Sequence, residues 1–181
     1  NVISRLPAEV VTSKVTNWAL KFDKDFGKCL LENPEFATKI FAIGRGSKKP
    51  RRDLATLADA KPYMSFFFDE FFEIQDEYPE TFDKADIKNT LEKFLDAYDE
   101  NDDMNVWFDK IKAIADTLGY ASDMKAYKTN PENFKGSVAD ISMFIRVAVT
   151  GKMNAPDLYT VMQILGYEKV KGRIGKMLLT I

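Results

Sequence analysis

The feature that most constrains this chain is the spacing of its apolar residues, which recur about every three to four positions along nearly the whole sequence. This spacing places them on one face of an α-helix, whereas a half-buried strand needs apolar and polar residues to alternate. No long alternating segment occurs, and the β-branched residues are scattered. The sequence therefore predicts an all-α fold.

Glycine and proline divide the first part of this pattern into expected helices. A helical stretch covers about 15–31 with a break near Asp23. Asn33 then offers an N-cap oxygen and Pro34 suits the first helical position, so a second helix is expected to run from there to about residue 43. The segment 53–72 holds the densest aromatic cluster, which predicts a helix buried between others.

The remainder of the chain predicts five more helices and a division into two lobes. Glycines that stop a helix stand at positions 119, 151 and 166. The acidic linker 75–83 is the expected boundary, which gives a first lobe at 1–75, with a basic loop at 44–52, and a second lobe at 76–181. The later helices are expected at about 86–98, 105–118, 137–150, 156–165 and 168–178.

The residue types exclude most kinds of catalysis. The chain contains no histidine, which removes Ser-His-Asp and Cys-His chemistry and the commonest base near neutral pH. Its single cysteine, Cys29, cannot form an internal disulfide and suits the reducing cytoplasm. The acidic turn 99–103 lacks the glycine and the final glutamate of a calcium loop, so no metal site is expected. No apolar stretch is long enough for a membrane span.

Charge is polarised along the chain although the net charge is only −2. Residues 76–109 carry 12 acidic and 3 basic side chains, while 110–181 carry 6 acidic and 11 basic ones. A polyanion responds to the local potential of the surface that it approaches. Binding of a nucleic acid therefore stays open, with the acidic block expected to face away from it.

Two basic features have alternative readings. The first is a loop whose cations are either solvated or contact phosphates and base edges; they are Arg45, Lys48, Lys49, Arg51 and Arg52. The second is Arg146, in the middle of an otherwise apolar helix. A buried arginine needs a partner, either a carboxylate of another helix or the acceptor atoms of a ligand.

Several segments resemble glutamyl-tRNA synthetases of the bacterial type. The strings RVAVTG at 146–151, APDLY at 155–159 and LGYEKV at 165–170 are similar to the end of that family's sequences. KPRRD at 49–53 and FFFDE at 66–70 resemble the entry into its anticodon-binding region, and residues 15–45 resemble its connecting domain. The loop 121–135 looks like an insertion relative to shorter relatives. The resemblance implies a two-lobed helical module of the α-helix cage type.

The resemblance also implies which residues bind tRNA. The residues expected at the anticodon are Arg51, Arg146, Ala155, Pro156, Leu158 and Tyr159. The residues expected at the tRNA backbone are Arg45, Lys48, Lys49, Arg52 and Lys112. Backbone amides at the start of the helix expected from Pro156 are further candidate donors. Some relatives have threonine where this chain has Ala155, so a hydroxyl contact to a base is missing there.

The family's ATP-binding signatures, of the form HIGH and KMSKS, are absent. The resemblance thus implies a non-catalytic C-terminal piece that binds tRNA-Glu as a cytoplasmic monomer, with no DNA or membrane partner. It implies no cofactor here, and ATP and magnesium in the intact enzyme. Two alternatives remain, the equivalent region of a class I lysyl-tRNA synthetase and a helical protein-interaction domain.

Overall fold

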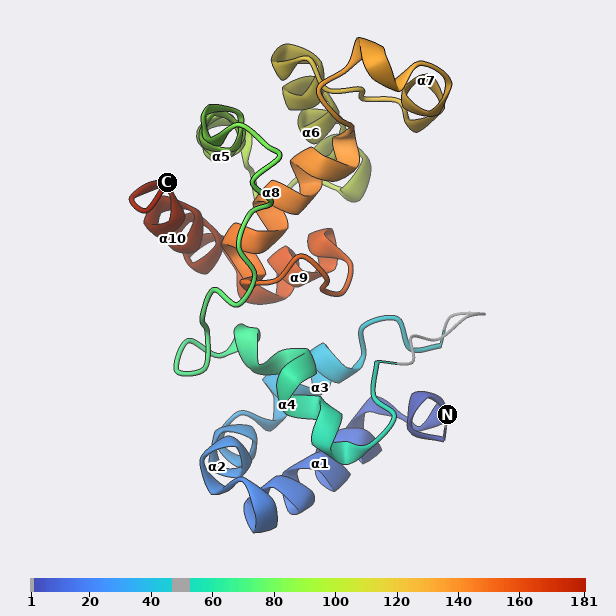
Figure 1. The fold of residues 1–181 in the computed structure, drawn as a ribbon. Coiled ribbons are helices and arrows are strands. Elements are labelled where there is room, and N and C mark those ends of the chain that lie inside the picture. The colour runs from blue at the N-terminus through green and yellow to red at the C-terminus, as the bar shows by residue number, and fades with distance from the viewer. Residues whose placement is uncertain (1, 47–52) are drawn as a thin grey trace. The chain divides into compact units, whose positions relative to one another are not determined.

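The structure is a computed structural model that describes residues 2–46 and 53–181. Within this part of the chain there are helices, turns and loops, one isolated β-bridge and no strand, which confirms the all-α fold. The chain divides into two compact units, unit 1 at 1–72 and unit 2 at 73–181. Figure 1 shows unit 1 from blue to blue-green and unit 2 from green to red. The assignment of the two lobes to connecting and anticodon-binding parts stays a prediction.

Unit 1 is built around helix α1, against which α2 and α3 pack. The break expected at Asp23 is confirmed, because this residue ends α1 and caps α2. Gly27 lies so close to the α1 backbone that a Cβ atom there would come within 2.5 Å of the Leu20 nitrogen. The α-helices of unit 1 are α1 (Ala8–Phe22), α2 (Lys24–Glu32), α3 (Pro34–Phe41) and α4 (Ala60–Met64).

The continuous helix expected over 53–72 is wrong, although the burial of its aromatic residues is confirmed. A 3₁₀ turn precedes the short α4, and another, Ser65–Phe67, follows it. Pro62 has no backbone N–H and would stand in the interior of a helix over 53–72, which it would break; in the short α4 it lies in the first turn instead. Phe66, Phe67 and Phe68 are consecutive and all buried. The 3₁₀ turn and the extended backbone at Phe68 allow this burial.

Unit 2 is centred on α8, which contacts α5, α6 and α10. Figure 1 shows α8 running through the middle of this unit. The stops expected at residues 119, 151 and 166 are confirmed. Its helices are α5 (Lys84–Ala97), α6 (Met104–Leu118), α7 (Met124–Thr129), α8 (Val138–Thr150), α9 (Leu158–Leu165) and α10 (Tyr167–Leu178).

Helix α8 is buried along most of its length. Ile141, Phe144, Ile145 and Val147 have no exposed surface. Ser137 forms a capping box with Asp140 at its start. A large apolar side chain buried this completely contributes about 1.5–3 kcal/mol relative to exposure, so α8 is a major contributor to the stability of unit 2.

One expected helix start is confirmed and another is wrong. Helix α3 begins at Pro34 after Asn33, as expected, but the Asn33 side chain accepts no capping hydrogen bond; its amide donates to the Cys29 carbonyl at 2.9 Å and satisfies the end of α2. The helix expected from Pro156 begins at Leu158, because Asp157 is the N-cap and its carboxylate accepts from the Thr160 amide.

The segment between α6 and α8, residues 119–137, is here called the excursion, and backbone hydrogen bonds join its two ends. The Val138 amide donates to the Ala121 carbonyl at 2.7 Å, and the Ala121 amide donates to the Gly136 carbonyl at 3.0 Å. Beside this closure, Lys135 and the hydroxyl of Tyr120 both donate to the buried carboxylate of Asp86. The segment expected as a plain loop contains α7 and a 3₁₀ turn.

Asp23 provides a test of how unit 1 is stabilised. Its carboxylate lies 2.6 Å from Lys61 Nζ and accepts from the Phe26 amide. The hydrogen bond from Lys61, more than that from the backbone, holds the pKa of Asp23 below its ordinary value. The stabilisation is therefore complete at neutral pH and is lost as the pH falls through that lowered pKa. We expect Asp23→Asn to reduce the unfolding free energy by about 1 kcal/mol at pH 7.

Urea denaturation of both proteins across pH measures this effect. The difference between wild type and variant is expected to shrink as the pH falls below the ordinary aspartate pKa of about 4 and to vanish below the lowered pKa of the folded protein, where the wild-type carboxyl is also protonated. A difference that stays constant down to acid pH would contradict a charge-based contribution.

Tyr98 provides a test in unit 2. Its ring stacks on Phe94 and Tyr167, with centroid separations of 5.4 and 5.6 Å. Its hydroxyl is buried without a hydrogen-bond partner among the described residues, and burial, assisted by nearby carboxylates, raises its pKa to about 12. A buried hydroxyl without a partner is unfavourable, so Tyr98→Phe is expected to raise the unfolding free energy by about 0.5–1 kcal/mol. Urea denaturation at pH 7 measures it, and a clear loss of stability would contradict this account.

Candidate nucleic-acid interface

A pocket of about 260 Å³ lies on unit 2, where α6, α8 and the start of α9 meet. Helix α6 supplies mainly apolar and aromatic side chains, and α8 supplies two polar ones. The start of α9 supplies one carboxylate and one apolar side chain. The lining residues are Met104, Asn105, Trp107, Phe108, Ser142, Arg146, Asp157 and Leu158.

The local sequence explains why these side chains meet. Asp103 caps α6 by accepting a hydrogen bond from the Val106 amide at 2.9 Å, so the first helical turn begins with Met104 and Asn105. On α8, Ser142 and Arg146 are four positions apart and therefore share one helix face. Both are half-buried, on a helix that is otherwise almost wholly apolar.

The charges at the pocket are balanced. Arg146 provides one positive charge and Asp157 one negative charge. The Asp157 carboxylate also accepts hydrogen bonds from the Thr160 amide at 2.9 Å and from its hydroxyl at 2.7 Å. A carboxylate at the helix start repels a phosphate, although the helix dipole would attract one. The pocket therefore suits a neutral, planar, hydrogen-bonding group better than a phosphate.

The aromatic wall of the pocket is supported from α9. Trp107 is 7% exposed, and its ring meets that of Tyr159 edge-on at a centroid separation of 5.5 Å. Phe108 is half-buried and stacks beside Trp107, and Met104 is 49% exposed. Exposed apolar surface next to a hydrogen-bonding group is what a splayed-out nucleobase needs for stacking.

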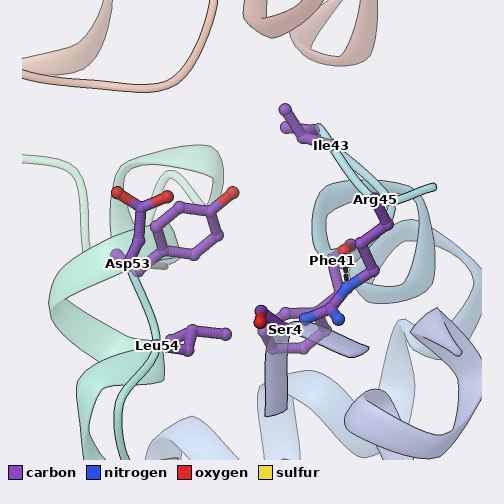
Figure 2. A pocket seen from close by; sticks show the side chains of 7 residues that line it. Ser4, Phe41, Ile43, Arg45, Asp53 and Leu54 are labelled. Carbon is purple, nitrogen blue, oxygen red and sulfur yellow. Dashed lines mark hydrogen bonds between the residues drawn. The ribbon is translucent and has the colours of Figure 1, made fainter. Parts of the chain in front are cut away.

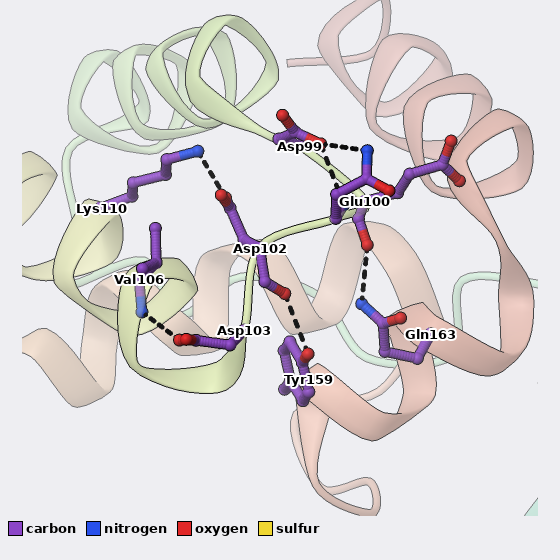
Figure 3. Close-up of polar contacts among 9 residues, drawn as sticks. Asp99, Glu100, Asp102, Asp103, Val106, Lys110, Tyr159 and Gln163 are labelled. Atoms are coloured by element: carbon purple, nitrogen blue, oxygen red, sulfur yellow. Dashed lines mark hydrogen bonds and ion pairs between the residues drawn. The ribbon is translucent and has the colours of Figure 1, made fainter.

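The acidic turn 99–103 adjoins this pocket. Tyr159 donates its hydroxyl proton to the Asp102 carbonyl at 2.9 Å, and the Gln163 amide donates to the Glu100 carbonyl at 3.3 Å. Figure 3 shows Asp102 reaching Lys110 with its carboxylate and Tyr159 with its carbonyl. The acidic turn thus lies beside the candidate pocket, and the expectation that the acidic block faces away from a bound nucleic acid stays a prediction. Lys110 offsets the charge of Asp102, and the α6 dipole offsets that of Asp103.

The pocket unites part of the expected anticodon set. Arg146 and Leu158 line it. Ala155 is half-buried and Pro156 is buried, and neither lines the pocket. Tyr159 is half-buried and reaches the pocket only through Trp107. The roles of these residues toward an anticodon stay predictions.

The basic loop is described only in part. Lys48, Lys49, Arg51 and Arg52 lie outside the described residues, and their expected contacts stay predictions. Arg45 is described, and its guanidinium donates to the carbonyls of three residues: Ile3 at 2.8 Å, Leu6 at 2.9 Å, and Phe41.

Arg45 thus has a structural role that needs no nucleic acid. Figure 2 shows its side chain beside Ser4 and Phe41, at a small cavity of about 20 Å³ that Asp53 and Leu54 also line. Burial lowers the pKa of the guanidinium from its ordinary value, yet arginine keeps its charge at neutral pH. Its expected contact to a tRNA backbone stays a prediction.

Lys112, the other expected backbone contact, lies on α6 one turn beyond Phe108. Its Nζ is 5.0 Å from the Phe108 ring centroid and 2.9 Å from the Asp109 carboxylate. The lysine is therefore near the aromatic edge of the pocket without lining it.

Sequence reasoning missed the residues of α6 that form half of the pocket: Met104, Asn105, Trp107 and Phe108. Their spacing is typical of an amphipathic helix, where aromatic residues usually indicate a core. The available signal was two apolar residues, Met104 and Val106, at positions that a capped first turn leaves exposed.

The described residues contain no group of His, Cys, Asp and Glu side chains arranged to hold a metal ion. None of the described helices has the length and hydropathy to cross a bilayer.

Comparison with known proteins defines the class. The family model of the anticodon binding domain matches residues 32–178, which is most of the chain. The chain therefore belongs to the anticodon-binding domain family. The match begins within α2, so it includes part of unit 1 and nearly all of unit 2.

Individual relatives are glutamate–tRNA ligases. The chain is 41% identical over 178 residues to that of Acetivibrio thermocellus, covering 98% of this chain and 33% of that protein. It is 39% identical over 179 residues to that of Sorangium cellulosum, covering 98% and 31%. The match to Clostridium perfringens is 38% over 182 residues, covering 98% and 33%. The chain thus spans about a third of the length of these curated relatives. The resemblance to glutamyl-tRNA synthetases, another name for these ligases, is confirmed.

The bond between α9 and the acidic turn is testable by Tyr159→Phe. This change removes the hydrogen bond to the Asp102 carbonyl and leaves that partly buried oxygen without this donor. We therefore expect a loss of about 1 kcal/mol in unfolding free energy. Urea denaturation measures the loss, with Tyr98→Phe as the matched control of opposite expected sign. Two variants with the same effect would contradict the assignment of this bond.

Proposed function

We propose that this chain is the anticodon-recognising part of a glutamate–tRNA ligase, that it binds tRNA-Glu, and that it carries none of the aminoacylation chemistry. The observation that supports this most directly is that the pocket of unit 2 combines Arg146 and Leu158, both expected at the anticodon, with the exposed Met104 and the half-buried Phe108. The family membership and the glutamate–tRNA ligase relatives support this proposal.

The recognition we infer is the capture of an unstacked base. A base that leaves the anticodon stack lies against Met104 and Phe108, and the buried Trp107 stacks beside Phe108. Such stacking contributes about 1–3 kcal/mol per base. Arg146 donates to acceptors on the edge of the base, where a planar guanidinium contacts two atoms at once. Because Asp157 balances the charge, shape and edge chemistry decide what enters.

The remaining expected contacts complete the proposal. Arg51 faces an anticodon base, and the other cations of the loop 44–52 contact phosphates, which adds a salt-dependent contribution to affinity. Aminoacylation, with ATP and magnesium, belongs to the remainder of the ligase. A sequence without histidine and without the family's ATP-binding signatures supports this division. A monomer in the cytoplasm, without DNA or membrane partners, is part of the same proposal.

A comparison of transcripts tests the function. We expect the chain to retard a tRNA-Glu transcript in a gel shift more strongly than the same transcript with a swapped anticodon. A tRNA-Lys transcript tests the alternative of a class I lysyl-tRNA synthetase. Equal affinity for all three would defeat anticodon reading and favour a helical protein-interaction domain.

Arg146 is the residue whose change is most informative. We expect Arg146→Ala to weaken binding of the tRNA-Glu transcript by about 1–3 kcal/mol, the range for a bidentate contact. The melting temperature is expected to change little. Arg146→Lys keeps the charge without the planar fork, so it is expected to restore only part of the affinity.

The exposed Lys125 on α7 supplies the charge-matched control. Lys125→Ala removes one positive charge at a position that does not line the pocket. It is expected to leave unchanged the ratio of the affinities for the native and the anticodon-swapped transcripts. A large loss of melting temperature in Arg146→Ala would instead identify Arg146 as a structural ion-pair member.

A further inference from the structure

The linker that opens unit 2 is fastened to the loop between α8 and α9. The Gly151 carbonyl accepts two hydrogen bonds from this linker, from the Gln75 amide at 2.9 Å and from the Asp76 amide at 3.0 Å. In return, the Asp76 carboxylate accepts a hydrogen bond from the Met153 amide at 2.7 Å. Two segments far apart in sequence thus hold each other through three hydrogen bonds.

The two backbones approach as closely as glycine permits. Gly151 has a φ of +75°, which disfavours any residue with a Cβ atom. A Cβ atom placed there would lie 2.1 Å from the Glu73 carbonyl oxygen. The stop of α8 is therefore also the contact point of the linker.

The fastened loop connects two walls of the pocket, the one on α8 and the one at the start of α9. At its start, the Thr150 hydroxyl donates to the Arg146 carbonyl at 2.8 Å, and the Lys152 amide donates to Thr150 Oγ1 at 3.2 Å. At its end, Asp157 and Leu158 line the pocket. Any shift of the loop changes the placement of the α9 start relative to α8.

Asp76 is the side chain that closes this arrangement. It lies in the linker and contributes no part of the pocket wall. Its carboxylate also faces Lys152, whose pKa burial lowers and Asp76 partly restores. Met153 is 41% exposed, so the bond to its amide secures a surface loop and not the core. Bonds of this kind fix local geometry while adding little to global stability.

We propose that Asp76 is a positioning residue for base recognition, which acts by fixing the loop 151–157 through the Met153 amide. This inference rests on the proposed function of the pocket. Precise placement of a binding group requires a supporting contact that locks it, and a loosened support reduces discrimination before it reduces folding.

Three variants of the 181-residue chain test it. Asp76→Ala removes the acceptor, Asp76→Asn keeps an oxygen that accepts from Met153, and Glu77→Ala removes the neighbouring exposed charge. The probes are anticodon stem-loop RNAs of tRNA-Glu with the native and with a swapped anticodon. The measured quantity is the dissociation constant for the swapped anticodon divided by that for the native one. General effects of charge on RNA affinity cancel in this ratio.

We expect Asp76→Ala to reduce this ratio about fivefold, the effect of one lost hydrogen bond. Asp76→Asn and Glu77→Ala are expected to keep the ratio within about twofold of wild type. Hydrogen exchange of the Met153 amide gives an RNA-free readout and is expected to accelerate in Asp76→Ala alone, with an unchanged melting temperature.

The outcomes separate the two proposals. A wild-type chain that does not discriminate between the stem-loops overturns the proposed function and this inference with it. Wild-type discrimination that survives Asp76→Ala overturns the inference alone. Failure of Asp76→Asn to retain discrimination would also overturn it, because the acceptor and not the charge is assigned the role.

Discussion

Unit 2 depends on the burial of one apolar helix. Helix α8 contacts α5, α6 and α10, and its core residues have no exposed surface, so these three helices share it as their common partner. Apolar burial of this kind is the main favourable contribution to folding. Where α6 and α9 leave α8 half-covered, two of its polar residues, Ser142 and Arg146, line an open pocket. The core helix thus also supplies the hydrogen-bonding wall of the site.

Some cationic side chains stabilise the fold, whereas others line the candidate site. Arg173 of α10 is buried and donates to the Val149 carbonyl at 2.8 Å, so this cation secures the end of α8. Arg45 has a comparable role in unit 1, where it gathers carbonyls of the N-terminal segment and α3. Arg45 stands in the basic loop that the sequence presented as a candidate binding surface. Charge alone therefore did not distinguish a cation that binds carbonyls from one that lines a pocket.

Much of the fold was predictable because it follows from local rules. Helical spacing, the break at Asp23 and the glycine stops depend on backbone geometry that the sequence states directly. The aromatic segment 53–72 was mispredicted as one helix because its apolar content indicates burial but not backbone geometry, and Pro62 limits the helix to the short α4 before the chain becomes extended at Phe68. Of the site, Arg146 and Leu158 came from the resemblance, and both line the pocket. The α6 wall was missed because exposure at a capped first turn depends on tertiary packing.

The closure beneath α7 has a consequence for how this module tolerates change in length. Backbone hydrogen bonds hold the two ends of the excursion together; they join Gly119 and Ala121 to Lys135, Gly136 and Val138. Loop-closure entropy grows only slowly with the number of residues enclosed. Residues between the pinned ends can thus be added or removed without altering the register of α6 or α8. The tip of this excursion is a natural place to graft a reporter peptide onto the protein.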